Sequence, residues 1–342
     1  MTVRLLTWNI RTGGRGGRLD ALVTLLRRER PDLLALQELR GFPGRRMRQV
    51  AGALGMTPFL VPSVFGQAVA VLVRPPLRIV GRSGVRWRLH HAAAAVWVPT
   101  TAGQLTVVST HLNPTSPHRR MREARFLAAR HRPAKGPVLL AGDLNALDPG
   151  TDHAGRLAGL SGPYRRRHLA ADGTADTRAI AAFEAAGFVD LWPKAASSEE
   201  AELGPKAAST EEAELGPKAA STEEAELGPK AASTEEAELE PKAASTEEAE
   251  LEPRAASYRE AELEPKTASY REAELESRGA DAGLTVPTSR GGGQEFSAAG
   301  MRLDYLLASP SVAARARDMR VLRGGEAEYA SDHYPLAVDL DL

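Results

Sequence analysis

The chain has 342 residues, of which 42% are hydrophobic and 26% charged, and its 44 Lys and Arg balance 44 Asp and Glu. It contains no cysteine, which excludes a disulfide scaffold, a thiolate zinc site and a cysteine nucleophile. No apolar run approaches the roughly 20 residues of a membrane helix, and the N-terminus lacks an apolar secretory region, so we expect a cytoplasmic protein without a membrane span.

Short apolar runs alternate with amphipathic stretches along the chain. The apolar runs predict strands at residues 3–10, 33–38, 68–73, 94–98, 105–110, 138–141, 188–191, 303–308 and 336–340. Helical spacing of apolar residues predicts helices at 19–30, 45–53, 117–129 and 177–186. Many strands with few helices between them indicate an α+β sandwich rather than a doubly wound sheet.

Residues 193–276 form a low-complexity tract of seven 12-residue units with the pattern P-K-A-A-S-T-E-E-A-E-L-G/E. The tract holds 9 Lys and Arg and 23 Asp and Glu, which leaves 35 basic and 21 acidic residues elsewhere. Each unit has one leucine and a proline that limits a helix to about two turns, so we expect a largely disordered insertion with short helices, or else an acidic interaction arm. Residues 1–192 and 277–342 then form one basic domain, which favours a polyanionic partner such as nucleic acid.

Polar side chains close several of the predicted strands, where a rigid scaffold often carries functional groups. Asn9 lies on the same strand face as Leu5, and Glu38 follows two core leucines of the next strand. A carboxylate at that place costs free energy unless it is paired or bound to a metal. His111 ends the strand that begins near residue 105. A turn-forming Asn9, an exposed Glu38 and a structural His111 remain the alternatives.

The segment L-L-A-G-D-L-N is the most informative one. Its apolar strand leads into Asp143 and Asn145, whose spacing lets a carboxylate orient water beside an amide, although an Asx turn explains the pattern too. Asp304 lies inside a predicted strand and needs a partner, while Asp332 and His333 lie in a loop before the last strand. A hydrogen bond from His333 to a buried Asp304 would fix the imidazole tautomer and raise its pKa.

These residue types agree with one another. Oxygen ligands without cysteine suit a hard cation, Mg²⁺ or Mn²⁺, far better than zinc. Two histidines and an Asp-x-Asn pair beside such a cation are what phosphate ester hydrolysis requires, because the cation neutralises phosphate and the side chains activate water.

Six motifs, taken in order, resemble the endonuclease/exonuclease/phosphatase superfamily: L-L-T-W-N-I, P-D-L-L-A-L-Q-E-L, S-T-H-L-N, A-G-D-L-N-A, R-L-D-Y-L-L-A-S and S-D-H-Y-P-L. The resemblance runs from the first strand to the last and omits the repeat. It implies a four-layer α/β/β/α sandwich of two packed mixed sheets, with the site where loops meet at one end of the sheets.

The resemblance also implies roles for particular residues. Glu38 would be the principal metal ligand, with Asn9 and Asp332 aiding metal and phosphate placement. Asp143 would orient or deprotonate water, with Asn145 beside it. His333, held by Asp304, and His111 would contact the phosphate. The division of acid and base roles between Asp143 and His333 stays open. Substrate contacts are expected from the set Asn113, Gln67 and His91.

Departures from particular relatives bear on the substrate. Apurinic-site enzymes of this group usually carry Tyr where this chain has His111, and the inositol phosphatases carry a cysteine-containing motif where this chain has M-R-L-D-Y-L. We therefore expect a Mg²⁺-dependent phosphodiesterase, an endo- or exonuclease acting on DNA. The alternatives are a phosphatase or phosphodiesterase for a small or lipid phosphoester, of inositol phosphate or sphingomyelin type, and a non-catalytic binding module.

Overall fold

The structure is a computed structural model, which describes residues 1–192, 283–290 and 300–342. The described strands form two six-stranded sheets. The first has the order β11 (Ala316–Val321), β12 (Leu336–Asp341), β1 (Thr2–Asn9), β2 (Leu33–Gln37), β4 (Val69–Val73), β3 (Thr57–Val61). The second has the order β5 (Gly81–Val85), β6 (Ala93–Thr100), β7 (Gly103–His111), β8 (Val138–Asp143), β10 (Asp304–Ala308), β9 (Val189–Asp190). Both sheets are mixed, because the pairs β1–β2 and β7–β8 are parallel and the other pairs antiparallel.

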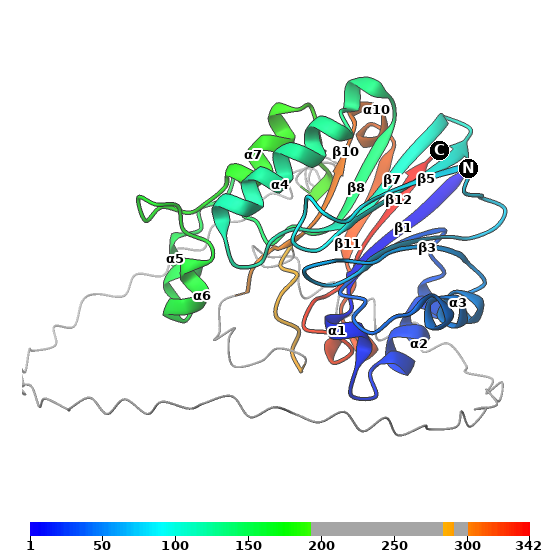
Figure 1. Cartoon of the computed structure of the whole chain (residues 1–342), viewed down its shortest axis with the longest axis horizontal. Helices are drawn as coiled ribbons and strands as arrows, with labels where there is room; N and C mark the ends of the chain where they lie inside the picture. Colours follow the sequence, from blue (N-terminus) through cyan, green and yellow to red (C-terminus); the bar gives the residue numbers. More distant parts are fainter. Residues whose placement is uncertain (193–282, 291–299) are drawn as a thin grey trace, which may run out of the picture. The chain divides into compact units, whose positions relative to one another are not determined.

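Helices cover the outer faces of both sheets (Figure 1). The first sheet carries α2 (Leu19–Glu29) and α3 (Gly44–Ala53), and the second carries α4 (Pro117–Arg130) and α7 (Arg178–Ala185). Shorter helical segments lie in the connections: α1 (Arg11–Gly14), η1 (Pro133–Lys135), α5 (Ala154–Ala158), α6 (Gly162–Arg166), α10 (Pro310–Ala313) and η2 (Gly325–Glu328). The predicted four-layer α/β/β/α sandwich is confirmed.

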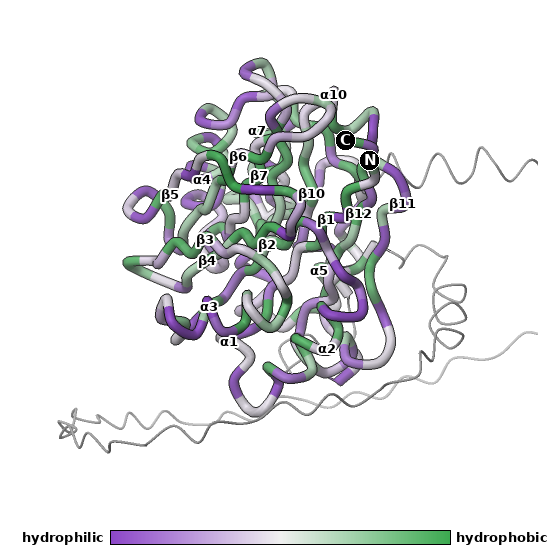
Figure 2. Tube along the Cα trace, turned by 90° about the vertical axis from the view of Figure 1, so that its right-hand side faces the viewer, coloured by the Kyte–Doolittle hydropathy of each residue, from purple (hydrophilic) through white to green (hydrophobic). Residues whose placement is uncertain are grey.

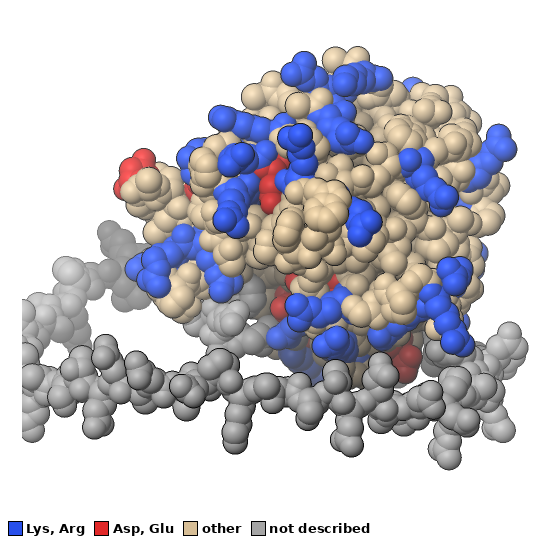
Figure 3. All heavy atoms as spheres, viewed as in Figure 1, with Lys and Arg blue, Asp and Glu red and all other residues tan. Residues whose placement is uncertain are grey.

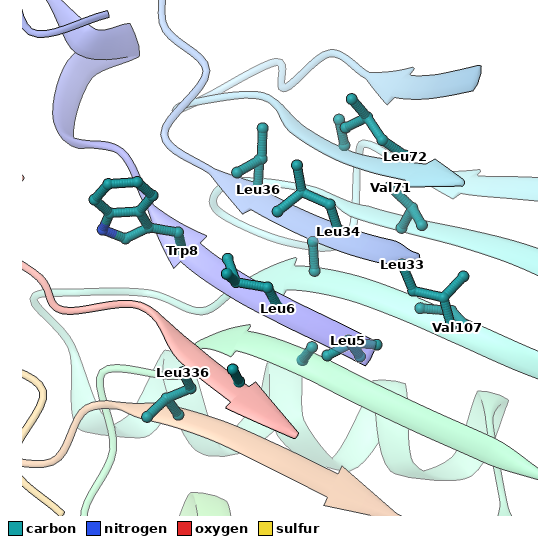
Figure 4. Close-up of a cluster of buried hydrophobic side chains, with 14 of the residues drawn as sticks. Leu5, Leu6, Trp8, Leu33, Leu34, Leu36, Val71, Leu72, Val107 and Leu336 are labelled. Carbon is teal, nitrogen blue, oxygen red and sulfur yellow. The ribbon is translucent and has the colours of Figure 1, made fainter. Parts of the chain in front are cut away.

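Alternate residues of the strands pack into different layers, because successive side chains of a strand point to opposite faces. Val107 belongs to the cluster between the sheets, whereas Val108 packs with the helices α4 and α7. Figure 4 shows the same alternation in β2, where Leu33 lies on one side of the strand and Leu34 and Leu36 on the other. Hydrophobic segments accordingly concentrate in the sheets and hydrophilic ones in the surrounding loops (Figure 2).

Every strand and helix predicted from the sequence is present, within a few residues at each end. The three strands that the prediction missed, β3, β5 and β11, all lie at sheet edges. Edge strands tolerate proline, glycine and charge, and these three read TPFLV, GRSGV and ARDMRV. Hydrophobic periodicity therefore does not identify them.

No helix in the described part of the chain combines the length and apolar composition that a bilayer span needs. The predicted insertion at 193–276 lies outside the described residues. The division into a catalytic domain and an insertion, and the cytoplasmic location, stay predictions.

Candidate functional site

The layer between the two sheets ends in polar side chains at one rim. Asn9 ends β1, while His111 and Asp143 end the parallel strands β7 and β8 at paired positions. Asp304 begins β10 directly opposite Asp143. Just below this rim Gln37 hydrogen-bonds to hydroxyl groups of both sheets, so the polar layer starts before the strands end.

Asp143 is the point at which these side chains meet. One carboxylate oxygen, Oδ2, accepts a hydrogen bond from the Asn9 amide at 3.0 Å and lies 3.3 Å from His111 Nε2. His333 Nε2 lies 3.7 Å from the same oxygen. The other oxygen, Oδ1, accepts the backbone N–H of Asn145 at 2.9 Å. The D-L-N pattern therefore forms an Asx turn, which brings Asn145 back toward the carboxylate, and the role of Asp143 in orienting water stays a prediction.

His333 is held from behind by Asp304. The distance from His333 Nδ1 to Asp304 Oδ2 is 2.8 Å, and the Asp304 side chain is 1% exposed. Burial alone would lower the pKa of His333, but the carboxylates of Asp304 and Asp143 outweigh burial and raise this pKa well above its usual value. Nδ1 is then the proton donor to Asp304, and Nε2 faces Asp143 with a proton.

The same balance governs Asp143 and His111. Burial alone would raise the pKa of Asp143, but His111 and His333 outweigh it, and the pKa falls below the usual range. Burial alone would lower the pKa of His111, but Asp143 outweighs burial and raises it. The rim therefore places a carboxylate whose pKa is lowered between two imidazoles whose pKa values are raised.

A second imidazole backs His111. The rings of His91 and His111 stack with centroids 3.9 Å apart, and His91 Nδ1 accepts the backbone N–H of Gln67 at 2.8 Å. Burial, followed by the charge of His111, lowers the pKa of His91, so His91 is neutral with its proton on Nε2. Among the described residues, His91 Nε2 and His111 Nδ1 have no hydrogen-bond partner, although both atoms are buried. Two buried ring nitrogens of the site are thus without a hydrogen-bond partner in the described residues.

Glu38 lies just past the end of β2, in a left-handed conformation with φ of 58°. Its carboxylate accepts hydrogen bonds from Asn9 at 3.1 Å, the Thr12 backbone at 2.8 Å and Gln67 at 2.7 Å. The positive φ ends the strand at Gln37. The expectation that Glu38 continues the strand face of Leu34 and Leu36 is therefore wrong, and hydrogen bonds rather than strand register orient it.

The segment R-T-G-G after β1 makes this arrangement possible. Gly13 has φ of 72° and donates its N–H to the Glu38 carbonyl at 2.7 Å. A Cβ at this position would overlap the carbonyl oxygen of Arg40 and lie 3.2 Å from its carbon. Only glycine fits there, and the resulting turn brings the Thr12 N–H to the Glu38 carboxylate.

Glu38 fits a hard cation. Burial alone would raise its pKa, but His111 and the Thr12 N–H outweigh burial and lower it, so the carboxylate is ionised. Asp332 pairs with Arg11 at 3.4 Å, whereas no Lys or Arg in the described segments forms an ion pair with Glu38. An ionised and mostly buried carboxylate that pairs with no Lys or Arg of the described segments offers the hard oxygen ligand that Mg²⁺ prefers.

A second group of potential ligands lies deeper. Atoms of Asp143, Asp304 and His333 lie within 4.8 Å of one another, close enough to hold a metal ion. However, the hydrogen bond between Asp304 and His333 already uses one nitrogen and one oxygen of this group. This hydrogen bond favours a proton-holding pair over a cation site, and Glu38 as the metal ligand stays a prediction.

The structure brings together seven of the predicted site residues: Asn9, Glu38, His111, Asp143, Asn145, Asp304 and His333. Asp332 lies next to His333 in the chain. Gln67 and His91 support Glu38 and His111 from the side. Asn113 accepts the backbone N–H groups of Thr115 and Ser116 and so organises the turn before α4. As substrate contacts, Gln67, His91 and Asn113 stay predictions.

Two buried charged residues of α4 were not among the residues predicted from the sequence. Glu123 accepts the backbone N–H of His90 at 2.6 Å and that of Asn113 at 2.7 Å, which fixes both histidine-bearing loops. Arg120, 1% exposed, donates to the Asn113 carbonyl at 3.0 Å. A signal was available, because both charges occupy the buried face of the helix that Met121, Ala124 and Leu127 define.

Comparisons with known proteins agree with this architecture. Residues 6–197, more than half of the chain, match the Endonuclease/Exonuclease/phosphatase family. A comparison with curated proteins found no match.

Three solved structures illustrate the shared fold. Truncated TDP2 from Caenorhabditis elegans has a TM-score of 0.55 at 14% identity, with 99% of this chain and 97% of that chain covered. A humanized TDP2 from D. rerio has a TM-score of 0.54 at 13% identity, with 100% and 99% covered. A family protein from Leptotrichia buccalis has a TM-score of 0.54 at 13% identity, with 99% and 100% covered. At these identities the similarity shows the fold alone.

Proposed function

The chain belongs to the Endonuclease/Exonuclease/phosphatase family of metal-dependent enzymes that hydrolyse phosphoester bonds, and we propose that it is a Mg²⁺-dependent phosphodiesterase that cleaves DNA. One observation carries the proposal. The carboxylate of Asp143 is met by Asn9, His111 and His333, which come from three distant parts of the chain. Such convergence of ionised and protonated groups is an arrangement for positioning and proton transfer.

The family's metal ion would be held by Glu38, with Asn9 and Asp332 beside it. When bound, Mg²⁺ supplies positive charge that offsets the charge of the phosphate. His111 Nε2 lies 3.3 Å from Asp143 and 2.9 Å from the amide nitrogen of Asn145, and these two side chains would bind a phosphate oxygen.

We assign the proton steps from the charge states. Asp143, held ionised by two imidazoles, accepts a hydrogen bond from the attacking water and takes its proton as the new bond to phosphorus forms. His333, held protonated by Asp304, gives its proton to the leaving oxygen as the old phosphorus–oxygen bond breaks. The two groups titrate as a coupled pair, so activity reports on both together.

DNA is proposed as the substrate because the chain outside residues 193–276 is basic. Outside residues 193–276 the chain has 35 basic and 21 acidic residues, and Lys and Arg outnumber Asp and Glu on the face shown in Figure 3. A basic surface concentrates a polyanionic substrate and speeds its association.

The test compares the intact chain with Glu38→Ala and Asp143→Asn, and with Asp20→Ala as a control that removes an exposed acid of α2. The substrates are plasmid DNA, an abasic oligonucleotide, RNA and inositol phosphates, each with Mg²⁺ and with chelator. We expect cleavage of DNA that chelator abolishes, loss of turnover in both site variants, and full activity in the control. Binding of Mn²⁺, followed by calorimetry, should weaken in Glu38→Ala alone.

Three outcomes contradict the proposal. Turnover of inositol phosphates without cleavage of DNA reassigns the substrate class. Full activity of Glu38→Ala at saturating Mg²⁺ removes the metal assignment. Metal-independent binding of DNA with no turnover of any phosphoester identifies a binding module.

A further inference from the structure

A groove with a volume of about 770 Å³ opens beside the site. We call it the aromatic groove, and its walls include Phe65, Trp87, Arg88, Arg119, Arg122 and Phe126. Trp87 is 72% exposed and Phe65 62% exposed, and their rings meet edge to face with centroids 6.4 Å apart. Large aromatic side chains exposed as a pair mark an interaction surface, since folding has not removed them from water.

The groove is basic. Its three arginines are exposed and form no ion pair with another described residue. Arg88 lies over the ring of Phe126, 5.7 Å from its centroid, so one cation already faces an aromatic surface. The acid in the wall is Glu123, which is 6% exposed and accepts two backbone N–H groups. Three guanidinium groups are therefore available to an anionic ligand.

A row of imidazoles leads from the groove to Asp143. His90 lines the groove and packs edge to face on His91, with centroids 4.6 Å apart. His91 stacks on His111 at 3.9 Å, and His111 contacts Asp143. Phe65 is also two residues from Gln67, which contacts Glu38.

We propose that the aromatic groove binds a single-stranded segment of nucleic acid, with bases on Trp87 and Phe65 and phosphates on Arg88, Arg119 and Arg122. This inference rests on the proposed function, and it specifies the form of the substrate. Bases of a duplex are stacked on each other and cannot lie on exposed rings, whereas unpaired bases can. Aromatic rings interleaved with unpaired arginines match alternating bases and phosphates better than they match a peptide.

The test measures binding of fluorescent 15-nucleotide single-stranded DNA, the same sequence as RNA, and the DNA duplex. The full chain is used with chelator, which prevents cleavage. Trp87→Ala is compared with Tyr329→Ala, because Tyr329 is the other exposed aromatic residue in the described segments. Arg122→Ala is compared with Arg125→Ala, which lies on the same helix and lines a different groove, between α4 and α7.

We expect Trp87→Ala to weaken single-strand binding at least fivefold and to leave duplex binding within twofold. Arg122→Ala should weaken binding and lower the slope of log K against log salt by about one. Both control variants should bind as the intact chain does. Equal binding of single-stranded DNA and RNA indicates recognition of the bases and phosphates that both contain. A tenfold preference for one of them identifies whether the natural ligand is DNA or RNA.

Hydrolysis of a small diester, bis(p-nitrophenyl) phosphate, separates this inference from the proposed function. Trp87→Ala should keep its kcat on this ester while its KM for the single strand rises. Normal ester hydrolysis together with equal strand binding by Trp87→Ala and Tyr329→Ala overturns the groove proposal and leaves the function intact. A groove-dependent loss of binding in a chain that hydrolyses no ester overturns the function and leaves the groove proposal standing.

Discussion

Gly142 tests how the packing of β7 against β8 positions His111 and Asp143. It precedes Asp143 in β8, pairs with Thr110 of the parallel strand β7 and has φ of 147°. A Cβ at this position would overlap the carbonyl oxygen of Thr110, lie 3.0 Å from the carbonyl carbon, and approach the Gln37 side chain at 3.3 Å. The obstacle is backbone in the middle of a sheet, which cannot swing away as a side chain can.

The cost of Gly142→Ala has three sources. The left-handed backbone costs an alanine about 1–3 kcal/mol. Forcing a methyl group into a packed region costs about another 1–3 kcal/mol, and each ladder hydrogen bond that the separation of β7 and β8 breaks costs about 1 kcal/mol. With one broken hydrogen bond the total of roughly 3–7 kcal/mol is a large fraction of the about 5–15 kcal/mol that stabilises a typical domain.

Gly103→Ala is the matched control. Gly103 also has a positive φ, of 105°, but a Cβ there would meet no atom within 4 Å. It therefore carries the backbone cost alone. Urea unfolding of the two variants should differ by about 2 kcal/mol or more, and hydrolysis of bis(p-nitrophenyl) phosphate should fall only in Gly142→Ala, because His111 and Asp143 separate. Equal stability of the two variants, within 0.5 kcal/mol, would refute the steric argument.

Three further predictions follow from other parts of the chain. Deleting residues 193–276, which carry 23 acids and 9 bases, should leave or raise DNA cleavage at low salt because repulsion of the substrate falls; a collapse of kcat would contradict this. Burial, followed by Arg120, lowers the pKa of His168 to about 3, so the folded state binds fewer protons than the unfolded state below pH 6.5. The free energy of unfolding should therefore fall by about 2 kcal/mol from pH 7 to pH 5 because of this group. In His168→Gln, urea unfolding should show a fall that is smaller by that amount. Parallel pH profiles of the two proteins would exclude a lowered pKa of His168. Gly52→Ala, at an exposed position of α3 where a Cβ meets no atom within 4 Å, should raise the unfolding free energy by about 0.5–1 kcal/mol, and a loss of stability would count against an ordinary helical conformation there.

The sequence predicts the site well because most of its residues continue regular strands. Asn9 and Asp143 lie at the ends of apolar runs that the sequence predicts as strands, and Asp304 begins another. Side chains at the ends of adjacent strands come together whenever the strands pair in register. A local pattern thus carries information about a distant contact, as between Asp143 and Asp304.

The sequence does not predict features that arise from turns and edges. The left-handed turn of Glu38 depends on a contact between Gly13 and the carbonyl of Arg40, which no local pattern reveals. Trp87 follows the edge strand β5, and the glycines and polar residues of this strand give no hydrophobic pattern from which the strand could be predicted. Charged edge strands avoid association with other sheets, and their sequences therefore resemble loops.

The position of the site is a consequence of how the core packs. Leu5 packs in the layer between the sheets, and two steps of two residues along the same face place Asn9 at the rim. In the other sheet Leu139 and Ala141 pack in the same layer, and the next step places Asp143 there. A slip of β8 by one residue would turn Asp143 out of the layer and bury Leu139 and Ala141 among the helices instead. The free energy that fixes the strand register therefore also fixes the carboxylate, and substitutions that disturb the packing between the sheets should reduce activity before they unfold the protein.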